Sequence, residues 1–158
     1  MAHYFITGAS SGIGAALAVQ LTAAGHQVSA VARRQQRLAT LSEQLDAFHG
    51  YVADVGDAES LATAIDKAKA KSGAIDVAIL NAGIYQPQDG TKIDPQIYAN
   101  HMTINYLGVV NALAGLVPDM VREGEGHIAI VSSVAGWRGL PKSAAYGPTK
   151  AALISLAE

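Results

Sequence analysis

Two side chains near the end of the chain could pass a proton to or from a substrate oxygen. Tyr146 and Lys150 are four residues apart in the segment Tyr-Gly-Pro-Thr-Lys. A tyrosine titrates near pH 10, so proton exchange at neutral pH needs help. A lysine one helical turn away on the same face supplies a positive charge that favours the phenolate. Tyrosine and lysine at this spacing also occur often by chance, so the pair needs support from other residues.

Two serines could hold a substrate against this tyrosine. Ser132 and Ser133 end a short apolar run that begins at His127. If the run is a strand, its end lies at the carboxyl edge of the sheet, where open α/β folds bind ligands. A hydroxyl there can hydrogen-bond a carbonyl oxygen, or it can simply close a turn. The same edge carries the turn that follows the first predicted strand.

That turn is rich in glycine. Gly8, Gly12 and Gly14 lie in residues 7–14, Thr-Gly-Ala-Ser-Ser-Gly-Ile-Gly, between a short apolar run and a helical pattern. Glycines at a strand-to-helix turn let the backbone approach a pyrophosphate and direct the helix N-terminus at its charge. They can also be purely steric, and the spacing differs from the commoner Gly-x-Gly-x-x-Gly. Their place in a β-α-β pattern favours dinucleotide binding.

A pair of arginines indicates which dinucleotide. An acidic residue roughly 20 positions after the glycines usually accepts the ribose hydroxyls of NAD. Here the second predicted strand is followed by Arg33 and Arg34, and the first acidic residue after the glycines is Glu43. Guanidinium groups pair well with phosphate, which favours the 2′-phosphate of NADP(H) over NAD(H). The alternative is a solvated start of a helix.

These residues need a scaffold, and the hydrophobic pattern predicts one. Short apolar runs alternate with longer segments of helical period, which predicts parallel strands joined by crossover helices in a three-layer, Rossmann-like doubly wound α/β fold. Asp57 and Asp94 are placed to cap helices, and Pro118 is expected to kink one. The predicted strands are 4–7, 27–31, 48–52, 77–81 and 127–132, and the predicted helices are 13–24, 35–45, 58–71, 95–122 and one starting at Ala144.

Composition narrows the function. The chain has 158 residues, half of them hydrophobic, a net charge of −2 and no cysteine, which predicts a single domain over 1–158. Basic residues form no run, so no nucleic acid is expected as a partner, and no apolar run approaches the roughly 20 residues of a membrane span. We therefore expect no membrane association and a cytoplasmic protein. The five histidines lack metal-site spacing, so no metal is expected.

Together these motifs resemble the short-chain dehydrogenase/reductase family. Residues 7–14 match its cofactor motif, Asn81-Ala82-Gly83 its motif after the fourth strand, and Ser133, Tyr146 and Lys150 its catalytic set. The resemblance implies that Tyr146 exchanges the proton, that Ser133 and not Ser132 is catalytic, and that Lys150 also bonds the nicotinamide ribose. Asn105 would support a proton relay to the lysine. The implied cofactor contacts are Gly8, Ser10, Ser11, Gly12, Ile13, Gly14, Arg33, Arg34, Asp54, Val55, Asn81, Ala82, Gly83, Tyr146 and Lys150.

The resemblance also implies a small carbonyl or alcohol substrate and a homo-oligomer, either a dimer or a tetramer. Asp54 and Asn81 have ordinary alternatives as turn residues, and Tyr85, Trp137 and Arg138 lie on loops that can face a substrate. Family members continue into further strands after the helix that carries Lys150, and these are absent from the sequence. We expect a truncated enzyme. The alternative is an inactive dinucleotide-binding or self-association module.

Overall fold

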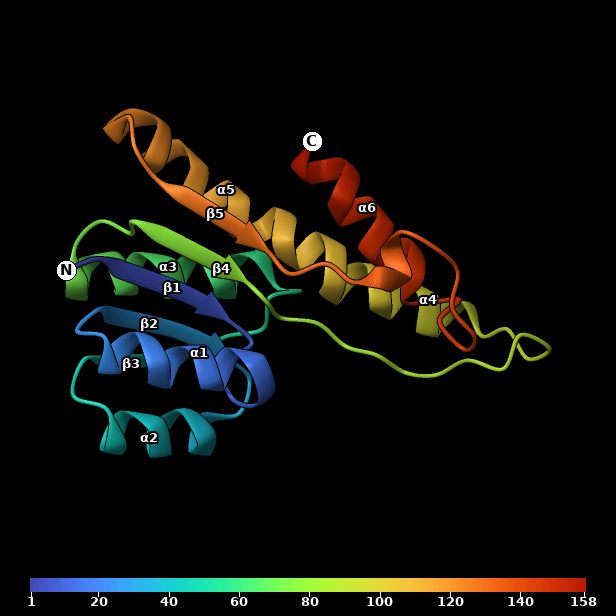
Figure 1. The fold of residues 1–158 in the computed structure, drawn as a ribbon, viewed down its shortest axis with the longest axis horizontal. Coiled ribbons are helices and arrows are strands. Elements are labelled where there is room, and N and C mark those ends of the chain that lie inside the picture. The colour runs from blue at the N-terminus through green and yellow to red at the C-terminus, as the bar shows by residue number, and fades with distance from the viewer.

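A computed structural model describes residues 1–158 and has one parallel five-stranded sheet in the order β3-β2-β1-β4-β5. The strands all point in one direction, and α4 and α6 lie beyond their carboxyl ends (Figure 1). This order is that of the first five strands of the doubly wound dinucleotide-binding fold. The strands are β1 (His3–Thr7), β2 (Gln27–Ala32), β3 (Phe48–Val52), β4 (Val77–Leu80) and β5 (His127–Ile130).

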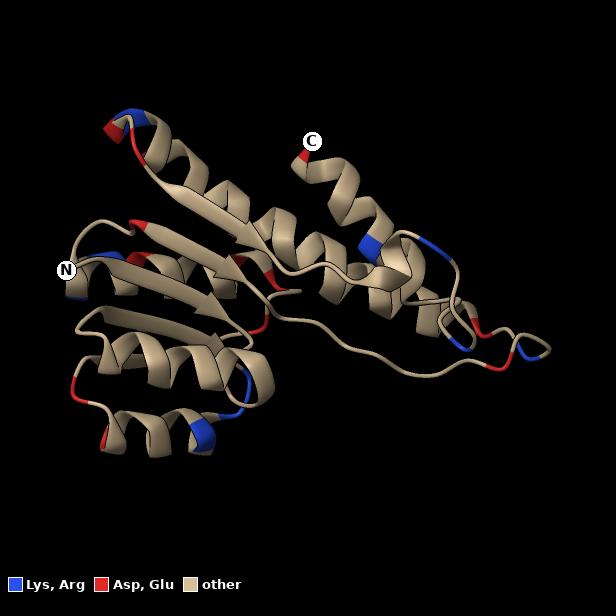
Figure 2. Cartoon of the chain, in the orientation of Figure 1, with Lys and Arg blue, Asp and Glu red and all other residues tan.

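Helices cover both faces of the sheet, as the pattern predicted. Consecutive strand residues face opposite ways, so Phe5 packs in the cluster formed with α3 and α5, and Ile6 packs in the cluster formed with α1 and α2. The strands contain no Lys, Arg, Asp or Glu (Figure 2), in keeping with burial on both faces. The helices are α1 (Gly12–Ala23), α2 (Gln35–Gln44), α3 (Ala58–Ser72), α4 (Pro95–His101), α5 (Gly108–Glu123) and α6 (Gly147–Ala157).

The helix predicted over 95–122 is interrupted by a change of winding. A π-helix, Met102–Leu107, joins α4 to α5, and α5 continues through Pro118. The whole run, Pro95–Glu123, is long and apolar enough to cross a membrane by length and mean hydropathy, a test that core helices of soluble proteins also pass. Here α5 packs against α3 and contributes Ala112 and Leu116 to the core.

Helix ends follow the predicted capping residues. The Asp57 carboxylate accepts the backbone N–H groups of Glu59 and Ser60, and Asp94 accepts that of Gln96 ahead of α4. Both carboxylates thereby satisfy donors that the first helical turn leaves unpaired. Helix α6 begins at Gly147, three residues later than predicted, and Tyr146 is its N-cap residue.

The strand register brings the loops of the site to one edge. Thr7 is level with Val31 of β2 and with Leu80 of β4, and Leu80 is level with Ile130 of β5. Strands β4 and β5 are slightly shorter than predicted and end at Leu80 and Ile130. The glycine turn after β1 and the segments that follow β2, β4 and β5 therefore all leave the sheet at the same carboxyl edge.

Candidate active site

The turn from β1 to α1 can be built only with glycine at two of its positions. Gly8 has a φ of +74°, and a Cβ there would lie 2.8 Å from the Cα of Ala82. A Cβ on Gly14 would lie 2.7 Å from the carbonyl oxygen of Gly8. Gly12 also has a positive φ, of +57°, but a Cβ there would meet nothing within 4 Å. The turn thus brings the start of α1 close to the end of β4.

The two serines of the turn hold an arginine. Arg34 donates from Nη2 to the hydroxyl oxygens of Ser10 and Ser11, at 2.8 and 2.6 Å, and from Nε to Ser10 at 3.0 Å. Ser11 is the N-cap residue of α1 but makes no side-chain cap bond. The first N–H groups of α1 therefore keep their hydrogen-bonding capacity for another acceptor.

The second arginine faces the end of β3. Arg33 Nη1 lies 3.8 Å from Asp54 Oδ2, and both side chains are substantially exposed. The other oxygen of Asp54 accepts the backbone N–H of Gly56 at 2.9 Å. Both arginines are at the start of α2, on the same edge as the glycine turn.

These residues surround one cleft of about 430 Å³. Eleven of the predicted cofactor contacts line it, namely Gly8, Ser10, Ser11, Ile13, Arg33, Arg34, Asp54, Val55, Asn81, Ala82 and Gly83. Gly12 and Gly14 shape the turn without lining the cleft, and Tyr146 and Lys150 lie outside it. Sequence reasoning missed Val31, Ala32, Ala53, Ile84 and Ile104. Val31 and Ala32 are the last two residues of β2 and Ala53 follows β3, so their place at the carboxyl edge was the available signal.

Asn81 joins two strand ends beneath the cleft. Its side-chain amide donates to the carbonyl oxygens of Thr7 and Gly8, at 3.1 and 3.4 Å. The hydroxyl of Thr7 in turn accepts the backbone N–H groups of Asn81 and Ala82, both at 3.0 Å. This mutual bonding fixes the end of β4 against the glycine turn.

The two serines after β5 have different partners. The Ser132 hydroxyl donates to the carbonyl oxygen of Lys150 at 2.9 Å. The Ser133 oxygen accepts the N–H of Ala135 at 3.2 Å and caps a short 3₁₀ helix, Val134–Gly136. Ser132 is therefore committed as a donor, whereas Ser133 keeps its hydroxyl proton for another acceptor.

Lys150 lies between the end of β5 and the ring of Tyr146. Its Nζ donates to the carbonyl oxygen of Val131 at 2.7 Å and lies 5.6 Å from the centre of the Tyr146 ring. The residue is 3% exposed, and this burial lowers the pKa of the ammonium. A Cβ on Gly136 would lie 2.7 Å from the Lys150 carbonyl carbon, so the 3₁₀ helix packs directly on α6.

Asn105 lies fully buried in the π-helix. Its Oδ1 accepts the N–H of Ile84 at 2.7 Å, and its Nδ2 donates to the Ile84 carbonyl oxygen at 3.0 Å. The same amide group reaches the hydroxyl of Thr149 at 3.1 Å, and that hydroxyl donates to the Tyr146 carbonyl oxygen at 2.7 Å. Buried Thr149 thus links Asn105 to the start of α6. Sequence reasoning missed it, because a threonine beside the lysine carries no signal of its own.

Gly83 is where the cleft meets these residues. It lines the cleft, and a Cβ at this position would lie 3.3 Å from Asn105 Oδ1 and 3.7 Å from Lys150 Nζ. The glycine turn, the arginines, Asn105 and Lys150 therefore form one continuous region at the carboxyl edge.

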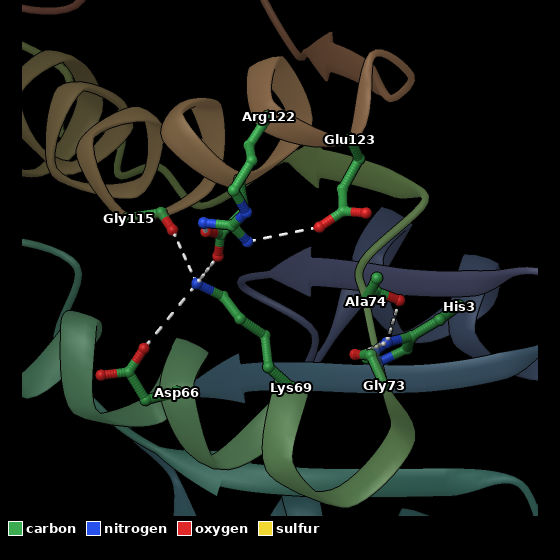
Figure 3. A network of polar contacts seen from close by, with 9 residues as sticks. His3, Asp66, Lys69, Gly73, Ala74, Gly115, Arg122 and Glu123 are labelled. Atoms are coloured by element: carbon green, nitrogen blue, oxygen red, sulfur yellow. Dashed lines mark hydrogen bonds and ion pairs between the residues drawn. The ribbon is translucent and has the colours of Figure 1, made fainter.

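A second cavity, of about 560 Å³, lies at the opposite edge and includes Asp76 and His127 at the amino ends of β4 and β5. Four of its charged side chains, Lys69, Asp119, Arg122 and Glu123, form a network of ion pairs (Figure 3). Lys69 donates to Asp119 and to the Gly115 carbonyl oxygen, and Arg122 Nη1 lies 2.7 Å from Asp119 Oδ1. These pairs tie α3 to α5, so we assign this cavity a structural role.

Comparison with known proteins agrees with this geometry. The sequence model of the short chain dehydrogenase family matches residues 2–158. An uncharacterised oxidoreductase of Listeria innocua is 34% identical, over 97% of this chain and 63% of its own length. A short-chain dehydrogenase from Streptomyces avermitilis superposes with a TM-score of 0.93 at 30% identity, over 99% of this chain and 58% of the other.

A further solved structure, described as ElxO with NADP bound, superposes with a TM-score of 0.91 at 29% identity, over 98% of this chain and 64% of that one. In all three comparisons the chain spans less than two thirds of the other protein. The match of fold, motif order and family model is nevertheless continuous over the chain. The chain belongs to the short-chain dehydrogenase family.

Proposed function

We propose that this chain forms the cofactor-binding and catalytic part of an NADP(H)-dependent oxidoreductase that interconverts a carbonyl and an alcohol. The observation that carries the proposal is the junction at Gly83, which borders both the cleft and Lys150. A dinucleotide in the cleft would end beside the residues able to move a proton. The bound cofactor would supply the hydride.

The residues of the cleft fit a phosphorylated dinucleotide. The glycine turn admits backbone close to a ligand, and the N-terminus of α1 offers N–H groups that no side chain caps. Arg34 is held over the turn by Ser10 and Ser11, and Arg33 lies nearby with its side chain exposed. Two guanidinium groups at the adenosine end suit a 2′-phosphate, and no carboxylate stands at their position after β2.

The catalytic assignments follow from which groups remain free. Ser133 has its proton available for a substrate oxygen, because in the structure its oxygen only accepts a hydrogen bond, from the N–H of Ala135. Tyr146 is the N-cap residue of α6, and its ring lies beside the Lys150 ammonium, whose positive charge stabilises a phenolate. We assign Tyr146 as the acid in reduction and the base in oxidation, Ser133 as the donor that holds the carbonyl oxygen, and Lys150 as the stabilising cation.

The cofactor assignment is tested by titrating the chain with NADPH and NADH, followed by cofactor fluorescence. Arg34→Ala should weaken NADPH by roughly tenfold to a hundredfold, the effect of losing a charge-assisted hydrogen bond, with little change for NADH. Arg33→Ala should show the same selectivity. Arg37→Ala is a matched control, since Arg37 is an exposed arginine in the first turn of α2, close after Arg34, and does not line the cleft. If the arginine variants lost affinity for NADPH and NADH equally, the preference for NADP(H) would be excluded.

The catalytic assignment is tested by following NADPH consumption on a panel of ketones and aldehydes. Tyr146→Phe should abolish turnover and leave the NADPH dissociation constant unchanged, because only the proton donor is lost. Normal turnover by this variant would exclude the role given to Tyr146. Binding of NADPH by the unaltered chain without consumption of any substrate would instead support a binding module.

A further inference from the structure

The loop after β4 is fixed on either side of Tyr85 by two buried side chains. Asn105 bonds both the N–H and the carbonyl oxygen of Ile84, at 2.7 and 3.0 Å. His101 Nε2 accepts the N–H of Gln86 at 3.1 Å. His101 and Asn105 are four residues apart on one helical run, and both are fully buried. They therefore hold the backbone immediately before and after Tyr85.

The role of His101 is defined by its two ring nitrogens. Because Nε2 accepts a hydrogen bond from Gln86, the proton must be on Nδ1, which lies 2.7 Å from the carbonyl oxygen of Ile97. Both nitrogens are thus used on backbone groups, one of its own helix and one of the loop. His101 is neutral in this arrangement and braces the loop.

A third bond ties the loop to the segment that carries Tyr146. The N–H of Gln88 donates to the carbonyl oxygen of Lys142 at 2.9 Å. The carbonyl oxygen of the next residue, Ser143, accepts the N–H groups of Tyr146 and Gly147, at 3.1 and 2.7 Å. The loop and the start of α6 are therefore held at a fixed separation.

This framework places the ring of Tyr85 against the ring of Tyr146. The ring centres are 5.2 Å apart and the planes meet at 67°, an edge-to-face arrangement that aromatic pairs favour. The Lys150 ammonium lies 5.6 Å from the centre of the same Tyr146 ring. Tyr146 thus has Tyr85 as an aromatic neighbour and Lys150 as a cationic one.

We propose that Tyr85, held by His101 and Asn105, is a positioning residue that keeps Tyr146 in the rotamer that faces Lys150. The inference rests on the proposed function, since it matters for catalysis only if Tyr146 moves the proton. The Tyr85 hydroxyl makes no hydrogen bond in the structure, and the ring supplies the contact with Tyr146, so Phe should serve at this position and Ala should not.

The direct test is nuclear magnetic resonance of the full chain, which requires neither cofactor nor turnover. The unaltered chain and Tyr85→Phe should show Overhauser contacts between the Tyr146 ring and the Lys150 side chain. In Tyr85→Ala these contacts should be lost or strongly weakened, because the Tyr146 ring gains other rotamers. Trp137→Ala is the control, an exposed aromatic of the loop after β5 with no ring partner. Unchanged contacts in Tyr85→Ala would overturn the proposal.

Tyr85 is 52% exposed, so Tyr85→Ala should fold. For the brace itself, His101→Gln keeps an acceptor near the position of Nε2 and should retain the contacts. His101→Leu removes the acceptor and should lose them. If His101→Leu folds and keeps the contacts between the Tyr146 ring and Lys150, the bracing role of His101 is excluded. If His101→Leu does not fold, Tyr85→Ala alone decides the proposal.

Turnover separates this inference from the proposed function. Tyr85→Ala should lower kcat by roughly tenfold to a hundredfold, the scale of a small misplacement of a catalytic group, with the NADPH dissociation constant unchanged. Tyr85→Phe should restore kcat. If Tyr146→Phe is inactive and Tyr85→Ala keeps the kcat of the unaltered chain, the positioning role of Tyr85 is excluded and the proposed function stands. Normal turnover by Tyr146→Phe would exclude the proposed function, whatever the ring contacts show.

Discussion

Lys150 is the residue where burial and charge conflict most directly. It is 3% exposed, and burial lowers the pKa of its ammonium below the ordinary value for lysine. Its single polar side-chain contact, with the Val131 carbonyl oxygen, replaces only part of the hydration lost. The site therefore holds its cation at a cost in stability, and that cost depends on pH.

The sign of this dependence follows from proton binding. Between the lowered pKa of the folded state and the value of about 10.4 in the unfolded state, the unfolded chain binds more protons at this position. The free energy of unfolding should therefore rise with pH through that window. Lys150→Met should lack this rise. Urea denaturation of both chains at a series of pH values measures the free energy of unfolding. If the difference in this free energy between the two chains stays constant with pH, the prediction is contradicted.

Gly8 and Gly12 form a matched pair for testing the glycine turn. Both have positive φ, so alanine at either should cost about 1–2 kcal/mol of stability through backbone strain. Only at Gly8 would the new Cβ overlap backbone, 2.8 Å from the Ala82 Cα. Gly8→Ala should be the more destabilising by about 1–3 kcal/mol. If chemical denaturation showed equal losses of stability for Gly8→Ala and Gly12→Ala, the close approach of the turn to the end of β4 would not be rigid.

Residues whose type is unusual for their place could be predicted from the sequence. The glycines and the paired arginines stand out because they directly follow the first and second predicted strands, so their place at one edge of the sheet could be predicted. Thr149 and His101 could not be predicted. A threonine and a histidine in an apolar helix look like ordinary core residues, and only the fold brings them to the backbone groups that they satisfy.

At the scale of elements, the site depends on how firmly β1 and β4 are joined at their ends. Thr7 is buried, and its hydroxyl oxygen is the acceptor for two N–H groups of the turn after β4. Thr7→Val keeps the shape of the side chain and leaves both donors without a partner. This should cost about 1–3 kcal/mol for each unsatisfied group.

The control for this prediction is Thr7→Ser, which keeps the hydroxyl. Loss of one methyl group should cost only about 0.8 kcal/mol. In thermal or urea unfolding, Thr7→Val should therefore be much less stable than Thr7→Ser. The opposite order would show that packing of the methyl group, and not the hydrogen bonds, holds the strand ends together.

The alternation of strands and helices was predictable because each element has its own hydrophobic period and capping residues. The π-helix was not, since nothing in the period over residues 102–107 marks a wider turn. Its effect is local: it carries buried Asn105, which bonds the loop after β4 at the candidate site. Wider helical turns of this kind occur often at functional sites.

At the scale of the whole molecule, the apolar surface is uneven. Val117 and Val121 lie one turn apart on α5 and are 37% and 73% exposed. Nearby residues of the same helix, such as Leu116, are buried against the sheet. Helix α5 therefore presents apolar residues both inward and outward. Contiguous exposed apolar surface favours association between proteins.

We therefore expect self-association through the outer face of α5. Val121→Lys should lower the self-association constant, because a charged side chain buried in an interface without a partner is strongly unfavourable. Ile93→Lys is the matched control, since Ile93 is 67% exposed but lies on the loop before α4. Sedimentation equilibrium over a range of concentrations measures both. Equal weakening by the two variants would indicate non-specific association, and no change with Val121→Lys would exclude this face.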